Sequence, residues 1–196
     1  FFKGFLFAMD GDGVIRTNYR QAGTRTGRLS SNNPNLQNLK RNSDGDSANV
    51  RQAFIPREGY RFFLIDYSQM EYRLMLEYAG AMGLINKVNG GLDVHTATAE
   101  LSRITRTQAK TVNFLTLYGG GIANLARQLG TTELEAKRIQ NAIFDSAPEI
   151  KKLIDTCKKT AKTRRVIYNW LGRPYYFPIS AYSYRAPNYL IQGGCA

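Results

Sequence analysis

The chain has 196 residues, 43% of them hydrophobic, and its 27 Lys and Arg against 15 Asp and Glu give a net charge of +12. This length and apolar content exclude wholesale disorder and allow one domain with a real core. The surplus of cations favours a polyanionic partner, nucleic acid first, although such charge can also serve solubility only.

The cysteines and the apolar segments indicate the compartment. Cys157 and Cys195 lie far apart without metal-ligand spacing, and Cys157 falls on an apolar helical stripe, so reduced thiols are expected. No apolar run is long enough to span a membrane, and the apolar start lacks the basic segment and cleavage site of a signal peptide. We therefore expect a cytoplasmic protein, in a bacterium or an infected host cell, with no membrane partner.

The first third of the chain predicts short strands and loops. Residues 24–46 are rich in Ser, Asn, Gly and Pro, which is typical of loop. Residues 61–66 (RFFLID) form a short apolar run that ends in a carboxylate, which predicts a buried strand. Ser68 and Glu71 then have the spacing of a capping box, which predicts a helix to about Gly80.

The rest of the chain predicts helices and one hairpin. N-terminal signals at Asp93, Thr132 and Pro148 each open a helix, and glycines end helices near 119–121 and at 130. The remaining elements are a hairpin over 166–170 and 175–177, and a last helix from about Ala186.

One predicted helix carries a row of residues spaced four apart: Arg106, Lys110, Phe114 and Tyr118. A step of four residues turns about 400° on an α-helix, so these side chains share one face. Cations suit a polyphosphate and a ring suits a base. An ordinary amphipathic helix is an equally good interpretation of this segment alone. The opposite face, expected to pack on a core, carries Ala109, Val112, Leu115 and Thr116.

Asp66 stands where the predicted strand meets a helix. A carboxylate at such a place suits Mg²⁺, which takes one or two carboxylates together with waters and phosphate oxygens. The alternative is that Asp66 only caps the following helix.

The segment LIDYSQMEYR, residues 64–73, resembles the first catalytic motif of family A DNA polymerases. Five further segments resemble motifs of the same family, in the family's order: TRTGRLSSNNPNLQNL, DVHTATA, RTQAKTVNFLTLYGG, LGRPYYFP and NYLIQGGCA. The resemblance spans most of the chain. It implies an α+β fold, the palm and fingers portion of a right-hand polymerase, with short antiparallel palm strands and a helical fingers subdomain.

The resemblance also implies a division of the chain. Residues 1–80 would be a palm portion with the primer-contacting loop and the first catalytic motif. Residues 81–165 would be the fingers helices, and residues 166–196 the hairpin and the start of the helix that leads back to the palm.

Catalysis in this family uses two Mg²⁺ ions that align the primer 3′-hydroxyl with the α-phosphate. Asp66 matches the first metal-binding aspartate, and the main-chain carbonyl of Tyr67 would be a further ligand. The second such aspartate of the family lies beyond Gln192 and outside this sequence, so these 196 residues alone are not expected to polymerise.

The matched motifs also imply a site for the deoxynucleoside triphosphate (dNTP). Arg106 and Lys110 would hold its phosphates, with Lys110 counted beside Asp66 as catalytic. His95 would reach the same group; from its residue type alone, it is expected to be a neutral, hydrogen-bonded residue. Phe114 would pack on the sugar and base. Gln69 would lie near the metal and sugar, and Glu71 with Tyr118 would form a barrier against a ribose 2′-hydroxyl.

Contacts with primer–template DNA are implied for a further set. Arg and Gln donors suit the minor groove, where every base pair offers an acceptor. For the amides in the first loop, hydrogen bonding within the loop is the alternative. The set comprises Thr24, Arg28, Asn35, Gln37, Asn38, Arg173, Asn188 and Gln192.

The expected function is template-directed DNA synthesis, with dNTPs and primer–template DNA as partners and a monomeric complete enzyme whose processivity factor is left open. One alternative is a single-subunit phage-type RNA polymerase, against which Glu71 and the Asn113–Phe114 pair argue. The other is a non-catalytic nucleic-acid-binding fragment. The short stretch between His95 and Arg106 resembles phage polymerases more than bacterial repair enzymes.

Overall fold

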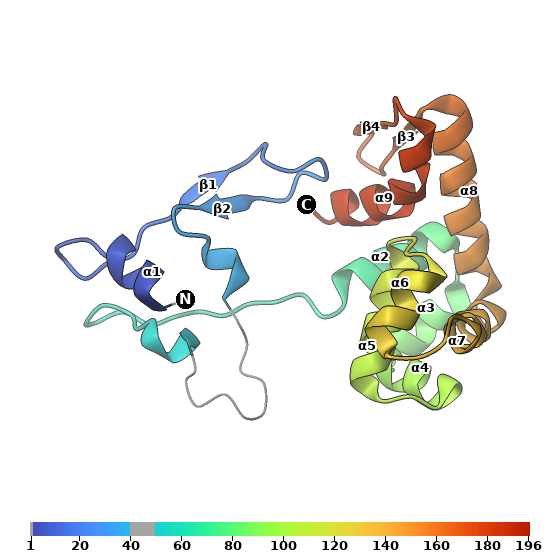
Figure 1. Cartoon of the computed structure of the whole chain (residues 1–196), viewed down its shortest axis with the longest axis horizontal. Helices are drawn as coiled ribbons and strands as arrows, with labels where there is room; N and C mark the ends of the chain where they lie inside the picture. Colours follow the sequence, from blue (N-terminus) through green and yellow to red (C-terminus); the bar gives the residue numbers. More distant parts are fainter. Residues whose placement is uncertain (1, 40–49) are drawn as a thin grey trace. The chain divides into compact units, whose positions relative to one another are not determined.

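The computed structural model describes residues 2–39 and 50–196, and it divides into a first unit that reaches Ser68 and a second unit from Gln69 to Cys195 (Figure 1). The described residues are mostly helical, with two small antiparallel sheets of two strands each. The expected α+β fold class is therefore confirmed.

The first unit is built around one small sheet. Tyr19 of β1 lies opposite Ser31 of β2, and the rings of Phe5 and Phe54 meet edge to face with centroids 5.7 Å apart. The helix at the start is a correction, because short strands and loops were predicted there. The elements are α1 (Phe2–Ala8), β1 (Asn18–Arg20), β2 (Ser30–Asn32), and the 3₁₀ turns η1 (Leu36–Asn38) and η2 (Val50–Ala53). Part of the predicted 24–46 loop, residues 40–46, lies outside the described residues.

The buried strand predicted over residues 61–66 is wrong. This stretch forms no strand, and Phe63, Leu64 and Ile65 are 89%, 95% and 88% exposed. An apolar run becomes a strand only where a neighbouring segment accepts its backbone hydrogen bonds. Among the described residues no strand pairs with it, and local sequence carries no information about that partner.

The second unit holds eight of the described α-helices and a hairpin. Their bounds are α2 (Met70–Ala79), α3 (Met82–Asn89), α4 (Val94–Ser102), α5 (Arg106–Leu117), α6 (Ile122–Leu129), α7 (Glu133–Ser146), α8 (Pro148–Arg164), β3 (Val166–Tyr168), β4 (Pro174–Tyr176), the 3₁₀ segment η3 (Ser180–Arg185) and α9 (Ala186–Gly194). Most of these helices begin where the sequence predicts a helix start. Asp93 accepts a hydrogen bond from the backbone N–H of Thr96, and Thr132 accepts one from that of Glu135.

Two helix starts differ from expectation. The N-cap position of α2 is Gln69 rather than Ser68; it has a left-handed conformation with φ of 54°, and its side chain makes no capping hydrogen bond. Helix α3 was not predicted at all. Its N-cap is Ala81, which makes no side-chain cap, so the usual sequence signal of a helix start is missing.

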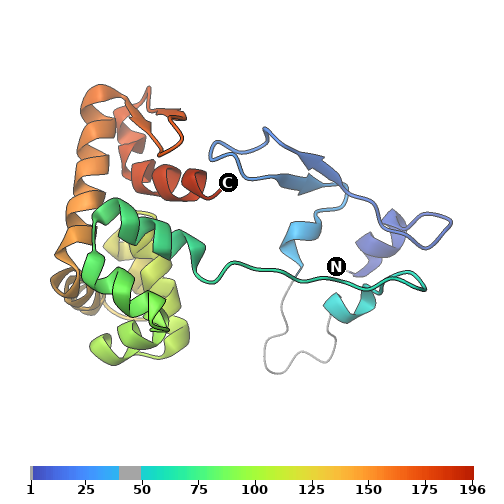
Figure 2. The ribbon, with the colours of Figure 1, turned by 180° about the vertical axis from the view of Figure 1, so that it is seen from behind.

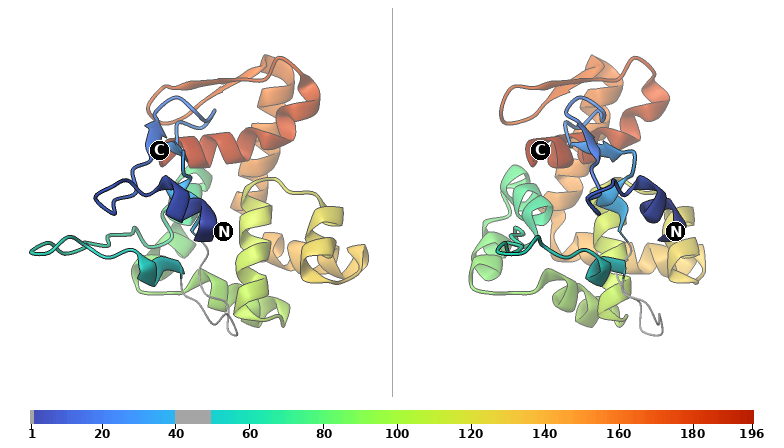
Figure 3. Two further views of the ribbon diagram at one scale, coloured as in Figure 1. Left: turned by 60° about the vertical axis from the view of Figure 1, so that its left-hand side comes forward. Right: turned by 90° about the vertical axis from the view of Figure 1, so that its left-hand side faces the viewer.

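Three apolar clusters hold the second unit together. Leu76, Ile85 and Ile150 join α2, α3 and α8, which Figure 2 shows from behind. Cys157, Ile167 and Tyr189 join α8, the hairpin and α9. The third cluster joins α5, α6 and α7, coloured yellow-green to orange in Figure 3; its buried members are Val112, Leu125, Ala126, Ala136, Ile139 and Ile143. Among the described residues, none of the helices is both long and apolar enough to traverse a lipid bilayer.

Candidate nucleotide-binding site

Helix α5 presents one face to the core and the other outward. A reciprocal capping box between Thr105 and Gln108 starts the helix. Ala109, Val112 and Thr116 are 0%, 0% and 4% exposed, which confirms the predicted packing face. The row spaced four apart lies on a different side of the helix, where its two cations are exposed. Its two aromatic rings are half-buried and pack against the cluster that joins α2, α3 and α8.

The last three members of the row, Lys110, Phe114 and Tyr118, contact one another in turn. The ammonium nitrogen of Lys110 lies 5.9 Å from the ring centre of Phe114, and the rings of Phe114 and Tyr118 are also 5.9 Å apart. The imidazole of His95, from α4, lies 6.0 Å from the ring of Phe114. The structure thus brings together four of the predicted nucleotide-binding residues along α5 and adds His95 beside them.

The first cation of the row, Arg106, forms an ion pair that the sequence did not predict. The guanidinium of Arg106 donates to the carboxylate of Asp93 at 2.7 Å. This bond, followed by the bond from the Thr96 N–H, lowers the pKa of Asp93 from 3.8 to about 2. The sequence identified Asp93 only as a helix start, since nothing local links it to a residue thirteen positions later.

The predicted pairing of Glu71 with Tyr118 is present. The phenol of Tyr118 donates to the carboxylate of Glu71 and so connects the end of α5 with the first turn of α2. Glu71, expected as the capping partner of Ser68, therefore accepts a hydrogen bond from a residue 47 positions away.

His95 is buried and hydrogen-bonded, as its residue type alone suggested. Its Nδ1 lies 3.0 Å from the side-chain nitrogen of Asn113, another residue that sequence reasoning missed. Burial lowers the pKa of His95, the charges of Arg106 and Lys110 lower it further, and Asp93 acts against them. The imidazole is therefore neutral at pH 7.

Asp66 and Tyr67 belong to the first unit, where both are exposed in an extended segment. Among residues 2–39 and 50–196, no three His, Cys, Asp or Glu side chains gather into a metal cluster. Mg²⁺ commonly binds through one or two carboxylates, with phosphate and water oxygens completing the shell. The accessible carboxylate of Asp66, followed by the backbone carbonyl of Tyr67, offers oxygen ligands of the kind that Mg²⁺ takes.

Two predicted site residues carry buried oxygens that lack a hydrogen-bond partner among the described residues. These are Oε1 of Gln69, at the start of α2, and Oδ1 of Asn188, on α9. Gln192 lies one helical turn after Asn188 and is half-buried. A buried amide oxygen without a protein partner is costly, so a polar ligand that donates to it would be favoured.

The predicted DNA-contacting loop is held by its own hydrogen bonds. Thr24 donates to the carbonyl of Arg28 at 2.8 Å, and the side chain of Asn35 accepts from the backbone N–H of Gln37 at 3.0 Å. Asn35 thus makes a hydrogen bond within the loop, while the side chains of Gln37 and Asn38 are exposed on η1.

Arg173 precedes β4 in the second unit. Its guanidinium lies 5.9 Å from the ring of Tyr175, and its backbone N–H donates to the side chain of Asn169 at 2.9 Å. The side chain is exposed at the tip of the hairpin, so the turn positions it by backbone bonds.

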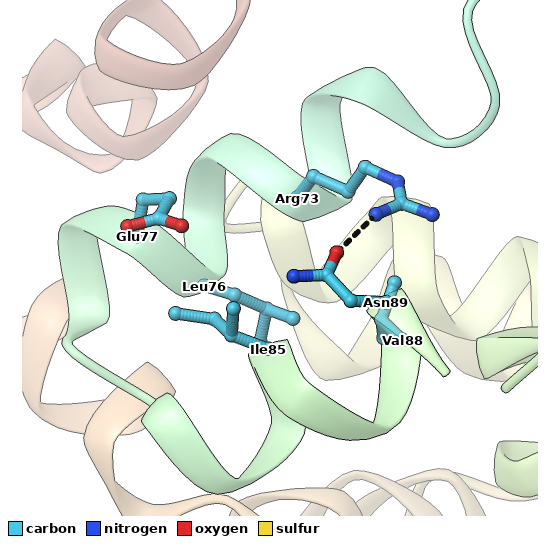
Figure 4. A pocket seen from close by; sticks show the side chains of 6 residues that line it. All are labelled: Arg73, Leu76, Glu77, Ile85, Val88 and Asn89. Atoms are coloured by element: carbon cyan, nitrogen blue, oxygen red, sulfur yellow. Dashed lines mark hydrogen bonds between the residues drawn. The ribbon is translucent and has the colours of Figure 1, made fainter. Parts of the chain in front are cut away.

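A small cavity between α2 and α3 is not a substrate site. Its volume of about 30 Å³ suits a water molecule and is far below that of ligand pockets. Figure 4 shows Arg73 and Asn89 at its edge, where the guanidinium donates to the amide oxygen at 2.8 Å. Leu76, Ile85 and Val88 line its apolar side.

Comparison with known proteins identifies DNA polymerases I among the relatives of this chain. DNA polymerase I of Pseudomonas aeruginosa is 36% identical over 176 residues, which are 85% of this chain and 19% of that protein. DNA polymerase I of Chloroflexus aurantiacus is 36% identical over 170 residues, 82% of this chain and 18% of that protein. The chain thus spans about a fifth of the length of the curated relatives it matches.

A solved structure agrees with these relatives. This structure is the POL domain of Pol1 from M. smegmatis in complex with DNA primer-template and dNTP. The match has a TM-score of 0.84 and 30% sequence identity, and it covers 98% of this chain and 37% of the M. smegmatis chain. The family model for DNA polymerase family A matches residues 3–196. On the motifs, the fold and these matches together, the chain belongs to DNA polymerase family A.

Proposed function

We propose that this chain supplies the nucleotide-binding part of a template-directed DNA polymerase. The reaction is attack of the primer 3′-oxygen on the α-phosphorus of a dNTP, with pyrophosphate as the leaving group. The observation that carries the proposal is the contact row on α5, in which cations, aromatic rings and the neighbouring His95 follow one another.

The two ends of the row suit the two ends of a nucleotide. Arg106 and Lys110 are exposed cations that bind phosphate oxygens by charge-assisted hydrogen bonds. Phe114 offers a half-buried ring against which a sugar and base pack. Phosphoryl transfer depends mainly on positioning and electrostatic stabilisation, which a rigid helix provides.

Arg106 has to exchange partners when a triphosphate binds. Its guanidinium donates to Asp93 at 2.7 Å, in a pair with both side chains partly exposed. Such an exposed pair is worth about 0–1 kcal/mol, so a polyphosphate with several negative charges competes for it successfully.

Glu71 and Tyr118 form the proposed barrier against ribonucleotides. The hydrogen bond between them fixes a carboxylate beside the aromatic end of the row. A ribose 2′-hydroxyl in that place would have to displace or crowd a fixed side chain. Gln69, whose buried Oε1 lacks a partner among the described residues, is proposed to accept a hydrogen bond near the sugar.

Asp66 and the carbonyl of Tyr67 are proposed to hold Mg²⁺, of which the complete enzyme would use two ions. When bound, the metal would supply activation of the primer hydroxyl and stabilisation of the departing pyrophosphate. The residues of this chain bind and orient the triphosphate, while the exposed carboxylate of Asp66 provides the anionic ligand.

The remaining site residues are proposed to hold primer–template DNA. The similar M. smegmatis domain was solved with primer-template and dNTP, which supports this partner. The proposed set is Thr24, Arg28, Asn35, Gln37, Asn38, Arg173, Asn188 and Gln192. The division into a palm portion (1–80), fingers helices (81–165) and a returning segment (166–196) stays a prediction.

The test compares charge removal on and off the row. Lys110→Ala and Arg106→Ala should each weaken dNTP affinity about 10- to 100-fold, because each removes hydrogen bonds to a charged group worth about 1.5–3 kcal/mol. The control is Lys137→Ala, an equally exposed cation on α7. Affinity is measured as the dNTP dependence of single-nucleotide incorporation by the protein that carries this chain.

Equal losses of dNTP affinity at all three positions would contradict the proposal, because they would show that the net charge of the protein causes the loss. Running the same assay with ribonucleotides separates the alternatives. Faster incorporation of ribonucleotides than of dNTPs supports an RNA polymerase, and no incorporation of either supports a non-catalytic binding fragment.

A further inference from the structure

A buried polar cluster lies directly behind the α5 row. Asn113, on the core side of α5, is 3% exposed, and its side-chain nitrogen lies 3.0 Å from Nδ1 of His95 and 3.0 Å from the hydroxyl of Thr98. The Thr98 hydroxyl in turn donates to the amide oxygen of Asn113 at 3.1 Å. The three side chains come from α4 and α5, are all buried, and lie within hydrogen-bonding distance of one another.

The orientation of the Asn113 amide, with its nitrogen toward Nδ1, sets the form of the imidazole. An amide nitrogen carries two hydrogens and cannot accept, so the Nδ1 that faces it has to be the unprotonated nitrogen of the ring. A neutral imidazole then carries its single proton on Nε2. The hydrogen bond that one ring nitrogen makes thus decides what the other ring nitrogen can do.

Burial keeps the ring neutral. His95 faces the acid Asp93 and the cations Arg106 and Lys110; burial lowers its pKa most, Asp93 raises it, and both cations lower it. Protonation of Nδ1 would also break the bond with Asn113, because a protonated imidazole has donors on both nitrogens and no acceptor. Burial and hydrogen bonding therefore favour the same state.

We infer that Asn113 is a positioning residue, which fixes His95 as the Nε2–H tautomer and so makes this N–H the donor that His95 offers to the triphosphate. The inference rests on the proposed function, because it adds a supporting residue to the same nucleotide site. It also gives Thr98 a role, since its hydroxyl bonds both the oxygen and the nitrogen of the Asn113 amide and holds it in place.

The first test reads the tautomer directly. His95 is the only histidine of the 196 residues, so long-range ¹H–¹⁵N spectra of the ¹⁵N-histidine-labelled protein show one imidazole from this chain. If the spectra are recorded on a longer protein that contains this chain, the His95→Gln variant identifies the His95 signal, because that signal disappears. The expected result at pH 7 is a protonated Nε2 and an unprotonated Nδ1. A protonated Nδ1, or rapid exchange between the two tautomers, would overturn the inference.

Variants test the cause. Asn113→Asp replaces the donor by an acceptor and should move the proton to Nδ1 while raising the pKa of His95. Thr98→Val leaves Asn113 in place but removes its hydroxyl partner, and should allow the two tautomers to exchange. Asn141→Asp makes the same chemical change as Asn113→Asp at an exposed position of α7 and should leave the spectrum unchanged. Unchanged tautomers in the first two variants would contradict the role of Asn113.

Kinetics then separate the inference from the proposed function. Asn113→Asp should raise the dNTP concentration for half-maximal incorporation about tenfold, as expected for one misdirected hydrogen bond to a charged group, with a small effect on the maximal rate. If the wild-type tautomer is as inferred but Mg²⁺–dNTP does not shift the imidazole signal, His95 has no role at the triphosphate and the proposed function fails there. If the signal shifts but the tautomer is Nδ1–H, only the present inference fails.

Discussion

The phenol of Tyr118, at the end of α5, donates a hydrogen bond to the carboxylate of Glu71 in the first turn of α2. The bond joins two helices that are separated by 47 positions in sequence, and both residues flank the aromatic end of the α5 row. A carboxylate held in this way has one position rather than many, which is the property that steric selection between two sugars requires.

Removing the carboxylate should relax sugar selection. We expect Glu71→Ala to raise ribonucleotide incorporation relative to dNTP incorporation about 10- to 100-fold, the equivalent of a hydrogen bond to a charged group. Tyr118→Phe keeps the ring but removes its hydrogen bond to Glu71, and should give a smaller change in the same direction. The measurement is the ratio of incorporation efficiencies for the two sugars.

Glu133→Ala, an exposed acid on α7, serves as the control for loss of negative charge. Sugar selection that stays at the wild-type value in Glu71→Ala would show that the bonded carboxylate is not the barrier.

The Asp93–Arg106 pair should make stability depend on pH in acid. The pKa of Asp93 is lowered to about 2 in the folded protein from its usual 3.8, so the unfolded chain binds the proton first as pH falls. The pair therefore stabilises the fold fully above about pH 4, and this contribution is lost as pH falls toward 2. Asp93→Asn should be less stable than the wild type at pH 7 and equally stable near pH 2, in urea unfolding at several pH values.

Asp145→Asn, at an exposed position of α7, should show no such convergence. A stability difference between Asp93→Asn and the wild type that is the same at pH 7 and pH 2 would exclude the ion pair as its cause.

Gly119 follows α5 in a conformation that other residues rarely adopt, and it lies in a crowded place. Its φ is +68°, and an added Cβ would lie 2.6 Å from the carbonyl oxygen of Tyr184. Gly130 has nearly the same φ, +65°, with nothing within 4 Å. Gly130→Ala should cost about 1–2 kcal/mol for the backbone alone. Gly119→Ala should cost about 1–3 kcal/mol more, because the carbonyl has to move.

Urea unfolding of the two glycine variants measures this difference, since the backbone term is common to both. Equal losses of stability would mean that the turn after α5 accommodates the methyl group without displacing Tyr184.

The two cysteines should differ in reactivity. Cys157 is buried between α8 and the hairpin, and burial raises the pKa of its thiol to about 11, so little thiolate exists at pH 8. Cys195 is only half-buried. We expect iodoacetamide at pH 8 to modify Cys195 well before Cys157, as followed by mass spectrometry of peptides, and both to react equally in urea. Equal rates in the folded protein would contradict the packing of α8.

The parts of the site that the sequence predicted depend on local spacing. The α5 row follows from a four-residue step, and the cap at Thr132 follows from a side chain three residues from its partner. Motif resemblance placed Glu71 and Tyr118 in one site, and the hydrogen bond between them is present.

The missed and mistaken parts depend on partners that are distant in sequence. The run at 61–66 has the composition of a strand, but pairing decides whether a strand forms, and the described residues supply no partner. From the sequence, Asn113 is only a helix residue with unfavourable helix propensity. Its hydrogen bond with His95 becomes apparent only in the fold. From the sequence, Asp93 is likewise only a helix cap. Its ion pair with Arg106, thirteen residues later, becomes apparent only in the fold.

The proposed function assigns the dNTP phosphates to the α5 row and, separately, a Mg²⁺ ion to Asp66. The most direct measurement is a crystal structure of the protein that carries this chain, with primer–template, Mg²⁺ and a non-hydrolysable dNTP. The account predicts that Arg106, Lys110 and Nε2 of His95 contact phosphate oxygens, and that an Asp66-bound Mg²⁺ ion contacts the same triphosphate. A nucleotide bound away from α5, or a metal that Asp66 does not touch, would contradict it.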